Sequence, residues 1–165
     1  MEIEMVVEIP GGSRNKYEMD HRLGRIRLDR MLFTSTRYPH DYGYIPDTCA
    51  EDGDPLDVMV LLEEPTFPGC QITVRSVGVF WMLDEKGPDA KILTVPSRDV
   101  RYAGINDLPD VQAHVLDEIS HFFDIYKSLE PGKSADVRGW QNREVADRTI
   151  TEAVERARTT ASPTA

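Results

Sequence analysis

Three aspartates stand close together in the stretch EDGDPLDVMV, immediately before a run of apolar residues. Carboxylates at such spacing can bind divalent cations, and they can equally well flank a turn. Asp-Gly and Asp-Pro are strong turn dipeptides, because Gly53 allows a positive φ and Pro55 fixes its own φ. Taken alone, the stretch is better explained as a turn. Residues elsewhere in the chain must decide whether Asp52, Asp54 and Asp57 take part in chemistry.

A second acidic stretch, LDEKGPDAKIL, places Asp84 and Asp89 on either side of a Gly-Pro turn, before another apolar run. If the two apolar runs are neighbouring strands, the aspartates of both stretches converge. Two carboxylates about 4 Å apart repel by about 4 kcal/mol at an effective dielectric constant of about 20. A crowded set must therefore bind hard cations or hold protons at neutral pH. Ligands that are all oxygen favour Mg²⁺ or Mn²⁺ over zinc.

An EF-hand calcium loop also spaces aspartates at alternate positions, but the first stretch departs from that pattern. Gly53 is the second residue of the run rather than the sixth, and Pro55 interrupts it. Predicted strands also flank the run instead of helices. The sequence therefore argues against a calcium loop.

Cationic and phenolic side chains lie in turn-rich segments between the predicted strands. Phosphoryl oxygens held by a divalent ion favour arginine as a bidentate partner and lysine as a point charge. A cavity with acidic metal ligands on one wall and basic residues on another would suit a phosphate-rich substrate. Any single candidate is more typical of a solvated cation or a half-buried tyrosine. The candidates are Lys16, Tyr17, Arg30, Tyr38, Tyr42, Tyr44, Lys91, Tyr126 and Lys127.

Short runs of alternating or β-branched residues fill the first part of the chain. They predict strands at 3–9, 24–30, 56–62, 71–83 and 90–95. Turn residues separate these runs and no stretch of helical period lies between them, so a parallel βαβ sheet is not expected. Short strands at close spacing favour a small antiparallel, OB-like β-barrel.

The last third of the chain has helical periodicity instead. Apolar residues fall on one stripe from 110 to 126, and a second helical pattern follows Asn142, a candidate N-cap. We expect an α+β fold in which two C-terminal helices pack against the barrel, within a single domain of residues 1–165. The small polar residues of 159–165 predict a disordered tail.

Bulk composition excludes several classes of protein. The 165 residues include 29 Asp+Glu and 19 Lys+Arg, a formal net charge of -10 at pH 7, which disfavours binding to nucleic acid and anionic membranes. The start MEIEMVVEIP lacks the basic and apolar regions of a signal peptide, and no apolar run reaches membrane-spanning length. Cys49 and Cys70 lack metal-ligand spacing and fit reduced thiols in a cytoplasmic protein.

The run DGDPLDV resembles the Asp-x-Asp-Pro-x-Asp-x signature of the soluble family I inorganic pyrophosphatases, in particular their bacterial, actinobacterial members. The resemblance continues, in order and spacing, through VVEIPGGSRNKYEMD, GRIRLDRML, YPHDYGYIPDT, RSVGVFWMLDEKGPDAKIL, INDLP and ISHFFDIYKSLEPGK. These segments run from Val6 to Lys133, and the resemblance covers the chain from about residue 3 to 140. The resemblance implies Mg²⁺-dependent hydrolysis of inorganic diphosphate to two orthophosphates by a metal-activated water, in a cytoplasmic homohexamer.

The resemblance also implies a role for each candidate residue. Asp57 is expected to bridge two metal ions, Asp54 to act as the general base, and Asp89 to be the alternative proton acceptor. The expected Mg²⁺ ligands, for which Mn²⁺ or Zn²⁺ are substitutes, are Glu8, Asp52, Asp57, Asp84 and Asp89. The expected phosphate-binding residues are Lys16, Arg30, Tyr42, Lys91, Tyr126 and Lys127, with Glu18 and Tyr38 in support.

Two other classes of protein remain open on the residues alone. An OB-like nucleic-acid module would use the same small barrel, but it needs a basic face with aromatic residues. A metal-dependent phosphatase that acts on nucleotides or phosphomonoesters is chemically closer. His21, in the turn MDHRLG, is expected to be an exposed turn residue rather than a ligand.

Overall fold

The computed structural model describes residues 1–161 of the chain. Within them, six strands form one sheet in the order β1-β4-β5-β7-β6-β8, and two form a separate ribbon. The sheet strands are β1 (Glu2–Ile9), β4 (Asp41–Tyr44), β5 (Asp57–Val60), β6 (Gln71–Asp84), β7 (Gly87–Pro96) and β8 (Ala135–Asn142). The ribbon strands are β2 (Asn15–Asp20) and β3 (Arg25–Met31), and the helices are α1 (Ala113–Ile125) and α2 (Arg143–Ala161), with short 3₁₀ turns at Val100–Tyr102 and Leu108–Asp110.

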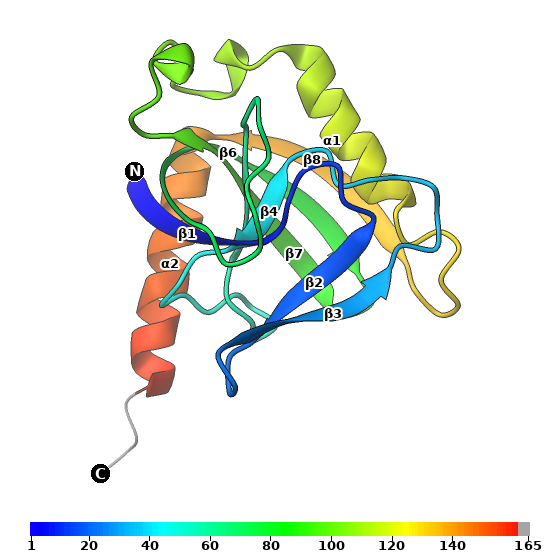
Figure 1. Cartoon of the computed structure of the whole chain (residues 1–165). Helices are drawn as coiled ribbons and strands as arrows, with labels where there is room; N and C mark the ends of the chain where they lie inside the picture. The colour runs from blue at the N-terminus through cyan, green and yellow to red at the C-terminus, as the bar shows by residue number, and fades with distance from the viewer. Residues whose placement is uncertain (162–165) are drawn as a thin grey trace.

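The expected combination of a mostly β core and two helices is confirmed. Figure 1 shows α1 and α2 against different sides of the sheet, with the β2–β3 ribbon standing apart from α2. All five predicted strands are present as β1, β3, β5, β6 and β7. In the described residues 1–161, no helix is long and apolar enough to cross a membrane.

Strand β1 pairs with two neighbours along different parts of its length. Its first half pairs with β6, and its second half pairs with β4. The expectation of an all-antiparallel sheet is wrong at one place, because β5 and β7 run parallel. The 14-residue strand β6 lies between them in the chain and pairs antiparallel with β7. The chain therefore returns along β6, and the parallel pair needs no connecting helix.

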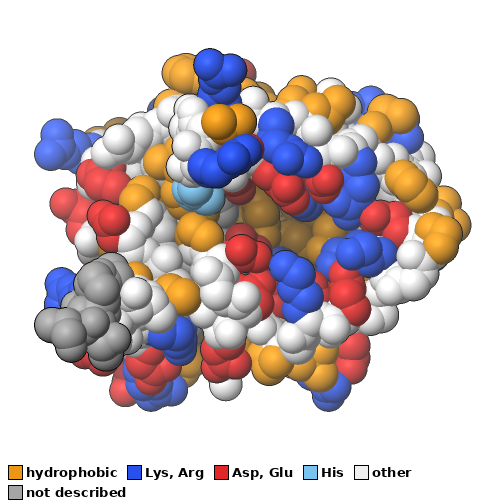
Figure 2. Space-filling view, turned by 90° about the horizontal axis from the view of Figure 1, so that it is seen from below, with side chains coloured by type: hydrophobic (Ala, Val, Ile, Leu, Met, Phe, Trp, Pro, Cys, Tyr) orange, Lys and Arg blue, Asp and Glu red, His pale blue; other side chains and the backbone are white. Residues whose placement is uncertain are grey.

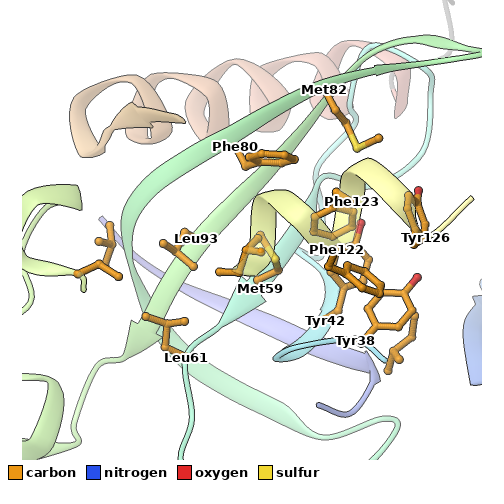
Figure 3. Close-up of a cluster of buried hydrophobic side chains, with 14 of the residues drawn as sticks. Tyr38, Tyr42, Met59, Leu61, Phe80, Met82, Leu93, Phe122, Phe123 and Tyr126 are labelled. Atoms are coloured by element: carbon orange, nitrogen blue, oxygen red, sulfur yellow. The ribbon is translucent and has the colours of Figure 1, made fainter. Parts of the chain in front are cut away.

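Two apolar clusters lie on opposite faces of the sheet, because successive side chains of a strand point to opposite sides. In β6, Phe80 and Met82 belong to one cluster and Val79 to the other. The first cluster includes Phe122 and Phe123 of α1, and Figure 3 shows these rings gathered with three tyrosines at one end of it. The second cluster takes up Ala146, Ile150 and Ala153 of α2.

Helix α2 begins as expected but ends later than expected. The side chain of Asn142 accepts a hydrogen bond from the backbone N–H of Val145 at 3.2 Å, as an N-cap does. The predicted tail begins at residue 159, yet the helix continues to Ala161. The hydroxyls of Thr159 and Thr160 donate to the carbonyl of Arg156 at 2.8 and 3.0 Å, the local bond by which threonine side chains are accommodated within a helix. Residues 162–165 of the predicted tail lie outside the described part of the chain.

Candidate active site

A cavity of about 630 Å³ is lined by residues of β1 to β4, of both acidic stretches, and of the turn after α1. Figure 2 shows the hollow, with acidic and basic side chains mixed around its rim and hydrophobic-class side chains, which include tyrosine, at its floor. Every residue predicted for the site lines this cavity: Glu8, Lys16, Arg30, Tyr42, Asp52, Asp54, Asp57, Asp84, Asp89, Lys91, Tyr126 and Lys127. The structure therefore brings the whole predicted set together.

The first acidic stretch is a turn, as its dipeptides predict, and it also faces the cavity. Gly53 has a φ of 91°, which a residue with a side chain rarely adopts. The backbone N–H of Ala50 donates to the carbonyl of Asp54 at 2.7 Å, and the N–H of Asp54 donates to Oδ1 of Asp52 at 3.1 Å. Strand β5 then begins at Asp57. The turn holds Asp52 and Asp54 at the exposed rim and places Asp57 deeper.

The parallel pairing of β5 and β7 brings the two acidic stretches together. Asp57 lies beside Lys91 in the register of these strands, and Asp89 is two residues before Lys91 and so on the same face. The ammonium Nζ of Lys91 lies 2.9 Å from Oδ2 of Asp57 and 2.9 Å from Oδ2 of Asp89. It also donates to the hydroxyl of Tyr42 at 2.8 Å, and that hydroxyl donates to Asp57. One buried cation is thus shared by two carboxylates, which together outnumber its charge.

The charge of Lys91 persists although its side chain is only 2% exposed. Burial lowers the pKa of the ammonium, but the carboxylates of Asp57 and Asp89 outweigh that effect and raise the pKa well above its usual value. Burial raises the pKa of Asp89 despite the opposing charge of Lys91. Burial likewise raises the pKa of Tyr42 well above its usual value, so its hydroxyl stays protonated as a donor.

The other cations of the cavity are also paired with carboxylates. Lys127 lies 3.1 Å from Asp84, and Arg30 donates through Nη2 to Glu130 at 3.0 Å. Lys16 contacts Glu18 as well as Asp29, the latter at 3.4 Å. Acidic and basic side chains therefore interleave and pair around the cavity.

The carboxylates do not form a closed metal cluster by themselves. In residues 1–161, no group of three or more His, Cys, Asp or Glu side chains is arranged to hold a metal ion. Asp57 and Asp89 contact the same ammonium instead, while Asp52 and Asp54 lie at the rim. The predicted ligands thus share a cavity and are all oxygen donors, the type that Mg²⁺ prefers.

Several residues that line the cavity were not among the predicted site residues. They are His21, Asp29, Glu85, Lys86, Glu130 and Lys133. The β2–β3 register shifts between Lys16 and Tyr17, so Asp29 bulges and faces the cavity beside Arg30 although neighbours in a regular strand alternate. His21 is exposed in a turn, as expected, and its ring packs edge-on against that of Tyr44, with the ring centroids 4.9 Å apart. A β-bulge has no signal in the alternation of residue types.

Glu8 gives the metal-free protein a pH-dependent stability. Burial raises the pKa of this carboxyl from 4.5 to about 7, against the lowering effect of a hydrogen bond from the Met19 N–H. Because the folded state holds this proton where the unfolded state has lost it, the contribution is full below about pH 4.5 and disappears as pH rises to about 7. We expect wild type to lose roughly 3 kcal/mol relative to Glu8→Gln over that interval.

Urea unfolding of both proteins at pH 5 and pH 8, in the presence of a chelator, measures this difference. Glu4→Gln is the matched control, because Glu4 lies on the same strand with an exposed side chain that accepts from Thr73. Parallel pH profiles for wild type and Glu8→Gln would contradict the buried proton.

Comparison with known proteins gives the class. The family model of inorganic pyrophosphatase matches residues 5–158. An inorganic pyrophosphatase of Streptomyces coelicolor is 55% identical over 150 residues, which cover 91% of this chain and 92% of the relative. One from Corynebacterium glutamicum is 52% identical over 156 residues, covering 94% and 98%. The crystal structure of inorganic pyrophosphatase from Thermus thermophilus superposes with a TM-score of 0.93 at 48% identity, covering 95% of this chain and 91% of that one. The fold is therefore that of a hydrolase.

The chain belongs to the soluble family I inorganic pyrophosphatases, in their bacterial form. The expected resemblance, including that to actinobacterial members, is confirmed.

Proposed function

We propose that the cavity hydrolyses inorganic diphosphate to two orthophosphates with the help of bound divalent cations, chiefly Mg²⁺. Family membership supports the reaction. The observation that carries the proposal for this chain is the convergence of two acidic loops and the phosphate-binding candidates in one cavity. A substrate of several negative charges approaches such an acidic cavity only when cations offset the repulsion.

The residues fit a set of Mg²⁺ ions. Oxygen ligands come from Glu8, Asp52, Asp57, Asp84 and Asp89, all of which line the cavity. Asp57 is the proposed bridging ligand. It is the carboxylate of the first acidic loop that contacts the Lys91 ammonium together with Asp89 of the second loop. When bound, the metal lowers the pKa of a water molecule and offsets charge on the phosphoryl oxygens. Mn²⁺ or Zn²⁺ are proposed as substitutes.

The basic and phenolic residues bind and orient the substrate. Arg30 supplies paired N–H donors, and Lys16 and Lys127 supply point charges, from different sides of the cavity. The hydroxyl of Tyr126 donates to a phosphate oxygen, because burial raises its pKa and keeps it protonated. The buried hydroxyl of Tyr42 also stays protonated, and it binds phosphate by turning its hydrogen away from Asp57. Lys91 adds charge from the floor. Fixed donors of this kind stabilise negative charge that develops on the leaving phosphate.

Asp54 is the proposed acceptor of the proton from the attacking water. Its carboxylate lies at the exposed rim of the cavity, where a water molecule can reach it, and its ion-pair partner Lys86, at 3.2 Å, is itself exposed. Asp89 is the alternative, because a ligand beside the water can also take the proton.

The Asp54→Asn variant separates these two assignments. We expect turnover to fall by about 10²-fold or more, with Mg²⁺ affinity nearly unchanged, because the amide cannot accept the proton. Steady-state kinetics and an isothermal Mg²⁺ titration measure the two quantities. A loss of metal binding as large as the loss of turnover would reassign Asp54 as a ligand.

A phosphate-release assay tests the function itself. Purified protein is supplied with diphosphate, ATP or a phosphomonoester, each with and without Mg²⁺. We expect release from diphosphate in Mg²⁺ and far less from the other substrates. Preference for ATP or the monoester would favour the other metal-dependent phosphatase considered above. A salt-sensitive gel shift of an oligonucleotide would instead support the nucleic-acid module, which the net charge of -10 disfavours.

We further propose that the sheet closes as a small OB-like barrel, which the pairing of β1 with both β4 and β6 supports. We propose a single domain over residues 1–165 and a homohexamer, the latter by resemblance to the family. A cytoplasmic location is proposed because Cys49 and Cys70 are free thiols.

A further inference from the structure

Glu130 is a buried carboxylate at the edge of the cavity with no role in the reaction described above. Its side chain is only 6% exposed. It lies in the turn that follows α1, where its backbone N–H donates to the carbonyl of Lys127 at 2.9 Å. The same turn carries two proposed phosphate-binding residues, Tyr126 and Lys127. A buried carboxylate requires a charged or hydrogen-bonding partner. The partner of Glu130 therefore indicates its role.

That partner is Arg30 on β3, one hundred residues away in the chain. Nη2 of Arg30 donates to Oε2 of Glu130 at 3.0 Å, and Nε lies 2.6 Å from Oε1. Glu130 therefore occupies the side of the guanidinium that is formed by Nε and Nη2. Asp29 contacts Nη1 of the same group. Because the guanidinium is planar and carries five N–H donors, fixing one side also fixes the direction of the remaining donors.

We propose that Glu130 is a positioning residue that orients the guanidinium of Arg30 toward the substrate. Apart from the buried Nε–H, which makes no hydrogen bond within the described residues, the donors that remain are one hydrogen each of Nη1 and Nη2, a pair that suits two phosphate oxygens. The contact also joins the β2–β3 ribbon to the turn after α1. It thus sets the distance between Arg30 on one side of the cavity and Lys127 on the other. The inference rests on the proposed phosphate-binding role of Arg30.

A double-mutant cycle tests this role through the binding of orthophosphate and through turnover. Wild type, Glu130→Gln, Arg30→Ala and the double variant are compared by calorimetric titration with inorganic phosphate in Mg²⁺, and by steady-state kinetics on diphosphate. We expect Glu130→Gln to weaken phosphate binding and to lower kcat/KM by about 10- to 100-fold, mainly through KM, because the guanidinium is displaced. In the Arg30→Ala background the same substitution should change either quantity by less than about twofold.

Glu63→Gln is the matched control. Glu63 also pairs with an arginine, Arg101, at 3.3 Å, but both side chains are largely exposed and neither lines the cavity. It should leave binding and kinetics unchanged. Thermal unfolding of each variant checks folding, and Glu130→Asp, which keeps the charge but shortens its reach, replaces Glu130→Gln if the amide variant does not fold.

An equal loss with and without Arg30, or no loss in the wild-type background, would overturn the inference. The cycle also separates it from the proposed function. Wild type that binds phosphate and shows the expected coupling, but releases none from diphosphate, would refute the reaction and leave the positioning role standing.

Discussion

The Asp57→Asn variant is expected to lose Mg²⁺-dependent phosphate release from diphosphate by about 10³-fold or more. Asp57 lies where the two acidic loops meet, and it contacts the ammonium of Lys91, which also contacts Asp89. Asparagine keeps the size and one acceptor oxygen but removes the charge, so the bridging contact proposed for this carboxylate would be lost. The fold should persist, because the amide oxygen can still accept from Lys91 or from the Tyr42 hydroxyl.

Phosphate release over a series of Mg²⁺ concentrations measures the loss, and thermal unfolding verifies the fold. Asp136→Asn is the matched control, because Asp136 is an exposed aspartate whose partner, Arg138 at 2.6 Å, likewise lies outside the cavity. That variant should retain wild-type turnover. Near-normal turnover of a folded Asp57→Asn protein at saturating Mg²⁺ would exclude the bridging role.

The membership of the site could be predicted from the sequence because its residue types are tied to turns and strand ends. Asp52 and Asp54 come with Gly53 and Pro55, and turn residues at the mouth of a strand place carboxylates at the edge of a sheet. The convergence of the two loops depends on a further fact, the parallel register that sets Asp57 beside Lys91. The alternation of residue types along one strand does not show which other strand it pairs with.

The pairing of charges within the cavity could not be predicted for a similar reason. Asp29 reaches Lys16 through a shift in the β2–β3 register, and Glu130 reaches Arg30 across a separation of 100 residues. Both contacts depend on tertiary geometry and not on local spacing. The short strand β4 is likewise absent from the strands that the sequence predicts. Its sequence DYGY is rich in turn-forming residues, and its burial between β1 and β5 overrides that local preference.

Gly43 shows the same dependence on tertiary contact. A Cβ at this position would lie 1.9 Å from the carbonyl oxygen of Val6, so β1 and β4 approach each other only because the residue is glycine. This close approach carries Tyr42 alongside Ile9 at the end of β1. In sequence the glycine marks a turn, while in the structure it allows the packing that sets a tyrosine at the floor of the cavity.

The second large effect is expected for the Lys91→Met variant, which changes the charge balance at the floor of the cavity. Methionine has a similar length without the ammonium, so Asp57 and Asp89 lose their shared cation and face each other partly buried. Removing one partner of a buried ionic group costs about 3–5 kcal/mol, and we expect a loss of that size in the free energy of unfolding of the metal-free protein. The loss should diminish at low pH, because protonation of Asp89, whose pKa is already raised, removes the repulsion.

Magnesium should reverse much of this loss if the same carboxylates are its ligands. Ions that bind the folded state stabilise it, and the more negative variant site should gain more from Mg²⁺ than wild type does. Urea unfolding of both proteins, in chelator and in saturating Mg²⁺, gives the two differences. Lys86→Met serves as the control, because this exposed lysine pairs with Asp54 at 3.2 Å at the rim of the same cavity and should cost less than about 1 kcal/mol. Equal stabilisation of wild type and Lys91→Met by Mg²⁺ would show that the ammonium and the metal ions do not neutralise the same carboxylates.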